Sequence, residues 1–171
     1  DIEFENRSRV SLDDYQNMIY LKTAYMIGLS AEIGGILSNL EQQQISLLKE
    51  FGDSIGMAYQ VQDDLLELFS DSDLMNKSLE SDFLLKKKTF LWASIDTNDV
   101  EEFEQIVDRF ISDKYNAIKD LKSFILNKGI KDKADSFVLQ KINYANSLLE
   151  EIDVNTDFLY YYSNLIFNRG N

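Results

Sequence analysis

The chain has 171 residues, no histidine, no cysteine and a net charge of −13. The missing histidine and cysteine exclude a Ser-His-Asp triad, a thiol nucleophile, disulfides and metal sites built from imidazole or thiolate. Only oxygen ligands remain for a metal, and these suit hard cations such as magnesium or calcium. The negative charge argues against nucleic acid as a main partner, because nucleic-acid binding depends on neutralised phosphates.

Length and patterning predict one helical unit over residues 1–171. A chain of this length can bury a sizeable core as one domain. Proline is absent and the glycines are scattered, so no linker marks a domain boundary. No run approaches the roughly 18 apolar residues of a membrane span. The lack of cysteine fits a reducing compartment, and we expect a cytoplasmic protein.

The first predicted helix begins where Ser11 is followed by Asp14, a pattern typical of a helix start. It continues to about Gly28, because apolar residues follow at helical spacing. These residues are Met18, Leu21, Tyr25 and Leu29. A separate second helix is expected over residues 31–37.

The apolar period over residues 42–69 predicts a long helix. Gly52 and Gly56 within it would allow a neighbouring helix to approach closely. A polar loop is expected over residues 70–81.

Further helices are expected over residues 82–95, 100–112, 114–126, 132–152 and 157–167. The helix over 132–152 carries a stripe at intervals of three to four residues that predicts a buried face. The stripe consists of Val138, Ile142, Ala145, Leu149 and Ile152. No strand alternation competes with the helical pattern, so the fold class is all-α, a helical bundle, without a Rossmann-type nucleotide site.

Three acids lie close together near the end of the long helix over 42–69. Asp63, Asp64 and Glu67 are spaced so that like charges share a face, which costs a few tenths of a kcal/mol per pair. Gln60 extends this polar face by one turn. A bound cation would offset the cost, and a solvated surface face is the alternative.

Lys22 is the single charged residue among the mostly apolar residues 18–29. An ammonium group in such surroundings either reaches the surface along its apolar stem or meets an anion. Thr23 beside it offers a hydroxyl donor. Together with the acids, this pair predicts a complementary set in which carboxylates hold a metal and lysines hold an anion that the metal also touches.

These residues resemble the trans-isoprenyl diphosphate synthases, the family that includes farnesyl, geranylgeranyl and longer polyprenyl diphosphate synthases. The family's second aspartate-rich motif, F-Q-x-x-D-D-x-x-D, resembles the run YQVQDDLLE that contains Gln60, Asp63, Asp64 and Glu67. Its Lys-Thr pair on the preceding helix resembles Lys22-Thr23.

Two later motifs of the family also have counterparts. Its Gly-Lys pair resembles Asn76-Lys77, and its D-x-x-x-x-K-x-T motif resembles residues 82–89, with Lys87 in the lysine's place. Four motifs in matching order make the resemblance specific over residues 1–92. It continues more loosely, as helices only, to residue 169.

The resemblance implies a head-to-tail condensation of an allylic diphosphate with isopentenyl diphosphate in a cavity among helices. Magnesium ions bridge the allylic diphosphate to two acidic motifs that face each other. A departing diphosphate gathers negative charge, and Mg²⁺ and lysines stabilise that charge. The resemblance also implies a homodimer.

The resemblance gives each matching residue a role. Asp63 and Glu67 would bind one magnesium ion, and Asp64 would act through water or through a ligand of the metal. The residues expected at the allylic diphosphate are Lys22, Lys77 and Lys87. Thr23 and Gln60 would lie against the reacting chain near the developing cation.

Other charged residues of these segments receive structural interpretations. Lys86 and Lys88 are expected to be solvated, and Asp82 to cap a helix. The pair Asp13-Asp14 lacks a further acid at the required spacing and is interpreted as a helix N-terminus.

The sequence also departs from the family pattern. Glu67 replaces the third aspartate of the motif, and Asn76 replaces the glycine before Lys77. No other aspartate-rich motif occurs, so the chain resembles the carboxy-terminal half of the family's fold. The alternatives are a non-catalytic helical subunit that kept the fold without the first motif, and a helical interaction module whose acids are surface charges.

Overall fold

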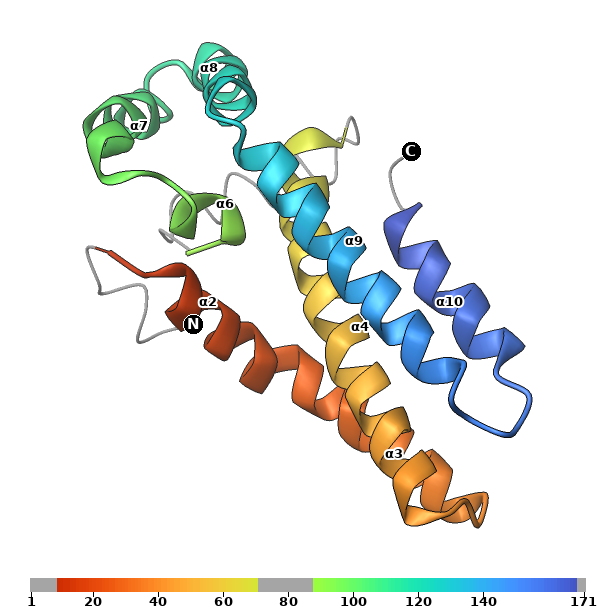
Figure 1. The fold of residues 1–171 in the computed structure, drawn as a ribbon. Helices are drawn as coiled ribbons and strands as arrows, with labels where there is room; N and C mark the ends of the chain where they lie inside the picture. The colour runs from red at the N-terminus through yellow and green to blue at the C-terminus, as the bar shows by residue number, and fades with distance from the viewer. Residues whose placement is uncertain (1–8, 71–87, 169–171) are drawn as a thin grey trace. The chain divides into compact units, whose positions relative to one another are not determined.

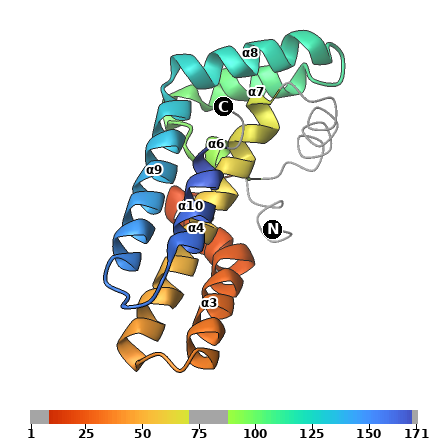
Figure 2. The same cartoon turned by 90° about the vertical axis from the view of Figure 1, so that its right-hand side faces the viewer.

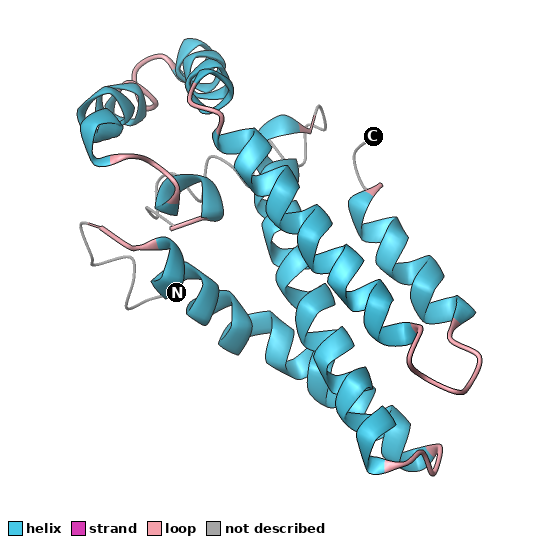
Figure 3. Cartoon of the chain, viewed as in Figure 1, coloured by secondary structure: helices cyan, strands magenta, loops and turns pink. Residues whose placement is uncertain are grey.

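The computed structural model describes residues 9–70 and 88–168. Within these residues every regular element is a helix and no strand occurs (Figure 3). The predicted all-α class is therefore confirmed. The chain divides into two compact units: unit 1 consists of Asp1–Tyr15 and Asp64–Ala134, and unit 2 of Gln16–Asp63 and Asp135–Asn171.

Figures 1 and 2 show the helices of the described residues. In chain order they are α2 (Leu12–Ile19), the π-helix η1 (Tyr20–Ala24), α3 (Tyr25–Leu37), α4 (Gln42–Phe69), α6 (Phe90–Ala93), the 3-10 helix η2 (Thr97–Asp99), α7 (Val100–Asp108), α8 (Lys114–Asn127), α9 (Ile130–Leu149) and α10 (Asp157–Phe167). None of these helices combines the length and the apolar character that crossing a membrane requires.

Several predicted boundaries agree with the structure. The helices α4 and α10 have the predicted bounds, and α8 ends one residue later than predicted. All five residues of the predicted buried stripe around α9 are buried. These segments agree because their apolar residues keep one helical period from end to end.

Several predicted boundaries were wrong. Helix α9 covers Ile130–Leu149 rather than residues 132–152. No break separates residues 25–30 from 31–37, because α3 runs through Gly28 without interruption. Helix α7 ends at Asp108 rather than at residue 112. Helix α6 begins only at Phe90, because Thr89 has an extended backbone and its hydroxyl caps the helix by accepting from the Trp92 amide at 3.4 Å. Residues 82–87 of the helix predicted over 82–95, and residues 71–81 of the loop predicted over 70–81, lie outside the described residues.

The start of α2 is the one that the sequence predicts. The Ser11 hydroxyl accepts a hydrogen bond from the Asp14 amide at 3.1 Å and donates one to the Asp14 carboxylate at 2.9 Å. The reciprocal contact satisfies an amide at the open end of the helix, as in a capping box.

The π-helix η1 changes which face of this segment is buried. Buried residues occur at Tyr15, Ile19, Ala24 and Gly28, so one interval of five interrupts the intervals of four. A π-turn adds one residue to a helical turn and produces this shift. Leu21, which a continuous α-helical spacing would include among the apolar positions, is 64% exposed.

In unit 2, α3 and α4 approach closely along small residues. A β-carbon on Gly56 would lie 2.4 Å from Cα of Ala24, and one on Gly52 would lie 2.7 Å from Cα of Gly28. The two helices are antiparallel, since residue numbers rise along one as they fall along the other. The turn between them contains Asn39 with a φ of 55°, a conformation that asparagine adopts more readily than most residues. The predicted close approach at Gly52 and Gly56 is confirmed.

In unit 1, α7 and α8 pack through aromatic rings and ion pairs. The ring of Phe103 lies 4.7 Å from that of Trp92 and 5.9 Å from that of Phe124. Lys128 contacts the carboxylates of Asp99 at 2.7 Å and Glu102 at 3.1 Å. The hydrogen bond to Asp99 raises the pKa of Lys128. This end of α8 is therefore tied to the start of α7.

The seam between α3 and α4 predicts opposite effects for the same substitution at two glycines. Gly56→Ala should lower the free energy of unfolding by about 1–3 kcal/mol, because the added methyl group meets the backbone of Ala24. Gly34→Ala, whose β-carbon would meet nothing within 4 Å, should raise it by about 0.5–1 kcal/mol. Urea unfolding followed by circular dichroism measures both. Equal effects would contradict the packing described for the seam.

Candidate functional site

The acids that the sequence singles out lie on the last turns of α4, but they do not share one environment. Asp63 and Glu67 are half-buried, whereas Asp64 is buried. Residues four apart project from nearly the same side of a helix, and adjacent residues project about 100° apart. Asp63 and Glu67 therefore form one face of α4, and Asp64 points to a different side.

Asp64 is held by two donors from other parts of unit 1. The hydroxyl of Tyr15 donates to Oδ2 of Asp64 at 2.7 Å, and the backbone N–H of Phe90 donates to the same oxygen at 2.6 Å. Tyr15 and Phe90 also contact each other edge to face, with ring centroids 5.8 Å apart. Hydrogen bonds to the charged form stabilise a buried carboxylate that would otherwise be costly.

Tyr15 had no role in the sequence interpretation. The only signal that could have suggested it is its place at the start of the buried run that continues at Ile19. A periodic pattern identifies a buried tyrosine, but it does not identify the acid that the hydroxyl meets 49 residues later.

In unit 2, the structure brings the predicted Lys-Thr pair next to the acid-bearing helix. The hydroxyl of Thr23 donates to Oε1 of Gln60 at 3.0 Å, and Gln60 lies one turn before Asp63 on α4. Lys22 and Thr23 belong to η1, a π-helix of five residues. Short π-helical segments are frequent at functional sites because they re-aim side chains within a helix.

Lys22 itself is exposed. Exposure of the residue agrees with the alternative in which its apolar stem extends to the surface. Four residues of the sequence interpretation lie outside the described residues, namely Lys77, Asp82, Lys86 and Lys87. Two of them, Lys77 and Lys87, are among the three lysines expected at a diphosphate.

The prediction that Lys88 is solvated was wrong. Its side chain is 7% exposed, and Nζ lies 4.0 Å from the centroid of the Trp92 ring. The face of an indole attracts a cation, which offsets part of the cost of removing the ammonium group from water. Sequence alone did not show this, because three consecutive lysines suggest a solvated run until the aromatic partner is placed.

The carboxylates of the described residues do not assemble a complete metal cage: no group of three acids in that part of the chain is placed to hold a metal ion. The pair Asp63 and Glu67 still has chemistry suited to Mg²⁺. Magnesium commonly takes one or two carboxylates from a protein and fills its other positions with water and substrate phosphates. The donor set is therefore compatible with Mg²⁺ that is shared with a phosphate ligand.

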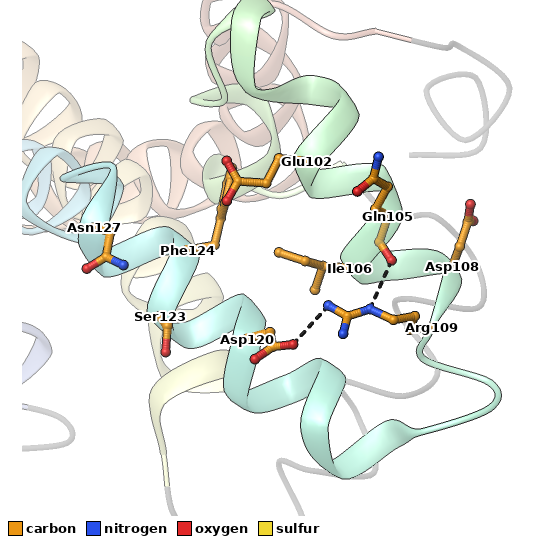
Figure 4. A pocket seen from close by; sticks show the side chains of 9 residues that line it. All are labelled: Glu102, Gln105, Ile106, Asp108, Arg109, Asp120, Ser123, Phe124 and Asn127. Atoms are coloured by element: carbon orange, nitrogen blue, oxygen red, sulfur yellow. Dashed lines mark hydrogen bonds and ion pairs between the residues drawn. The ribbon is translucent and has the colours of Figure 1, made fainter.

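A groove of about 600 Å³ lies between α7 and α8 in unit 1 (Figure 4). Arg109 of this groove donates a hydrogen bond to the carboxylate of Asp120 at 2.8 Å and another to the backbone oxygen of Gln105 at 3.3 Å. The remaining charged side chains of its lining, Glu102 and Asp108, are acidic. The groove contains none of the residues predicted from the sequence, and its one arginine is already engaged by an acid.

Similarity to solved structures defines the fold of the chain. The solved geranylgeranyl pyrophosphate synthetase of Pyrococcus horikoshii has 28% identity to the chain and superimposes with a TM-score of 0.82, covering 98% of this chain and 52% of that one. The heptaprenyl diphosphate synthase of Staphylococcus aureus, at 22% identity and a TM-score of 0.79, shows the same fold over 99% of this chain and 54% of that one. The fold is the all-α fold of isoprenyl diphosphate synthases.

Residues 1–127 match the polyprenyl synthetase family, and the chain belongs to that family. It is 30% identical over 156 residues to a geranylgeranyl diphosphate synthase of Saccharolobus solfataricus, covering 90% of this chain and 47% of that protein. A short chain isoprenyl diphosphate synthase of Methanothermobacter thermautotrophicus is 27% identical over 154 residues, with 90% and 47% covered. The chain thus spans about half the length of these relatives.

The burial of Lys88 predicts a stability effect. Lys88→Gln should lower the free energy of unfolding by about 1–2 kcal/mol, because it removes the cation from the face of Trp92. Lys133→Gln, at an exposed position of α9, should change it by less than about 0.5 kcal/mol. Thermal unfolding of both variants provides the comparison. A loss at Lys88 no larger than at Lys133 would show that the ring contact contributes nothing.

Proposed function

We propose that the chain supplies the second aspartate-rich motif of a trans-prenyltransferase that condenses an allylic diphosphate with isopentenyl diphosphate. The observation that carries the proposal is the hydrogen bond from Thr23 to Gln60. It joins two segments that resemble separate family motifs, and it does so one turn from Asp63. Membership in the polyprenyl synthetase family supports the same reaction class.

Each residue contributes a separate function to the proposed reaction. Asp63 and Glu67 present carboxylates from one face of α4 and would hold Mg²⁺. The exposed ammonium group of Lys22 would bind the allylic diphosphate. Thr23 and Gln60, which orient each other, would place uncharged polar atoms beside the reacting chain. Mg²⁺, when bound, would neutralise the charge that a departing diphosphate collects.

The proposed activity needs more than this chain provides. The relatives described above are about twice as long as the region of them that matches this chain. The resemblance places the first aspartate-rich motif and the isopentenyl site in the part that the chain does not span. A reactive carbocation must also be shielded from water. We therefore propose that the chain acts together with an amino-terminal half of the fold, in a cytoplasmic homodimer.

Apolar side chains on α3 provide a surface for such a half in unit 2. Met26, Ile33, Ile36 and Leu37 are between 47% and 77% exposed. Exposed apolar residues at this density on one helix favour a protein contact over a purely solvated surface.

Asp63→Ala tests the metal face. In a protein that contains both halves of the fold, it should lower turnover by about 100- to 1,000-fold, because the charge on the departing diphosphate loses a preorganised counter-ion. Asp13→Ala is the matched control, since it removes an exposed aspartate from the chain's other Asp-Asp pair. Product formation from allylic and isopentenyl diphosphates at saturating Mg²⁺ is the measurement. Unchanged turnover in Asp63→Ala would exclude Asp63 as a metal ligand.

Mixing the chain with a separately produced amino-terminal half tests the half-fold proposal. The chain alone should be helical, should self-associate and should form no prenyl diphosphate. Product should appear only in the mixture that supplies the first aspartate-rich motif. Turnover by the chain alone would refute this proposal. A folded mixture that binds but stays inactive would favour the non-catalytic subunit instead.

A further inference from the structure

The outward side of α8 in unit 1 carries lysines in a chain that is acidic as a whole. A groove of about 710 Å³ follows this side, and the charged residues of its described lining are Lys114, Lys119 and Lys122. The one acid of α8, Asp120, is paired with Arg109 in the groove between α7 and α8 (Figure 4). Among the described residues, Lys119 and Lys122 form no ion pair. Positive charge is therefore concentrated on this side of the helix.

Apolar side chains lie among these lysines. Tyr115, Ile118, Lys122 and Leu126 follow one another at intervals of three to four residues, so they project from one side of α8. Tyr115 is 80% exposed and Leu126 is 51% exposed. We call the three lysines of the groove, together with Tyr115, Ile118 and Leu126, the α8 face. It combines exposed apolar area with cations on a single helix.

We propose that the α8 face docks on an anionic lipid surface, with α8 lying parallel to the membrane. The stem of a lysine packs along apolar groups while its ammonium group reaches the headgroups. Tyrosine is enriched at the boundary between lipid and water. A helix that presents both kinds of side chain binds in this boundary through apolar burial and through attraction to anionic lipids.

Charge complementarity favours a lipid surface over a protein partner. A purely apolar partner would cover Lys119 and Lys122 without supplying counter-charges, and burying unpaired ammonium groups is costly. An acidic protein would need carboxylates at positions that match the lysines. A fluid leaflet meets both requirements, because its headgroups move to the lysines and its acyl chains receive Tyr115 and Leu126.

The net charge of −13 does not prevent this docking. At physiological ionic strength, exposed charges more than about 8 Å apart are largely screened from each other. The lipid surface therefore interacts mainly with the charges that lie nearest to it, which on the α8 face are lysines. Each lysine close to an anionic leaflet strengthens binding by about fivefold. The expected association is reversible and depends on salt.

Flotation with lipid vesicles tests the docking, because bound protein rises with the vesicles whereas self-associated protein sinks. The 171-residue chain should float with phosphatidylcholine vesicles that contain about 30% phosphatidylserine. It should not float with phosphatidylcholine alone, and flotation should be lost at about 1 M salt, where the Debye length is about 3 Å. Failure to float with the anionic vesicles would overturn the proposal.

A pair of lysine variants locates the electrostatic contact. Lys122→Gln should weaken vesicle binding by about fivefold. Lys141→Gln makes the same charge change about 16 Å along α9 from its first residue. It should weaken binding by less than about twofold, because this distance exceeds the Debye length. Equal losses in the two variants would place the lipid contact elsewhere and contradict the proposed face.

A pair of leucine variants tests the apolar contact. Leu126→Ser should weaken vesicle binding by about threefold or more, because less apolar area leaves water. Leu139→Ser, at a leucine of α9 that is 44% exposed, is the matched control and should leave binding unchanged. Circular dichroism checks that each variant keeps its helices. If Leu126→Ser binds as tightly as the control, apolar insertion does not occur and the proposal fails.

Two further results would assign the α8 face to another partner and would also overturn the proposal. Binding of soluble polyglutamate as tight as vesicle binding, and unaffected by Leu126→Ser, would indicate an acidic polypeptide. Flotation of this chain but not of a protein that contains both halves of the fold would show that the amino-terminal half covers the face. The docking is separate from the proposed reaction, so Asp63→Ala should float as well as the unaltered chain even where it abolishes turnover.

Discussion

The hydrogen bonds to Oδ2 of Asp64 are the constraint that holds three segments of unit 1 together. Burying a carboxylate is costly unless donors replace its water, and here a side-chain hydroxyl and a backbone amide do so. Since these donors come from α2 and from the start of α6, the cost of burial is offset only when all three segments are assembled.

A second constraint acts in unit 2, where two glycines of α4 have no side chain and so allow the neighbouring helix to pack closely. Gly56 leaves room for the backbone of Ala24, and Gly52 does the same for Gly28. The extra residue of the π-helix places Ala24 in this seam, so the small residues and the π-turn belong to the same adaptation. Thr23 precedes Ala24 and meets Gln60. The polar contact between Thr23 and Gln60 thus lies beside the closely packed small residues.

The sequence predicted those features that depend on neighbours along the chain. The bounds of α4, the buried stripe of α9 and the cap at Ser11 follow from local period and local hydrogen bonding. Two wrong predictions were local: Lys88 is buried with its ammonium group over the nearby Trp92 ring, and residues 31–37 continue α3 without a break. The motif resemblance singled out Thr23 and Gln60, which the structure joins by a hydrogen bond. The contact of Tyr15 could not be predicted in this way, because its partner lies 49 residues away.

The three acids of the motif do not share one face as their spacing alone implies. Asp64 is buried and accepts hydrogen bonds from the Tyr15 hydroxyl and the Phe90 amide, so the half-buried face is formed by Asp63 and Glu67. Asp63 and Glu67 remain one turn apart on α4, where two carboxylates repel each other by a few tenths of a kcal/mol. That repulsion is small enough for a folded chain to retain, and a divalent cation held by Asp63 and Glu67 would offset it. In the proposed reaction, the same cation would connect this face to a diphosphate, so the electrostatic cost in the protein becomes binding energy for the substrate complex.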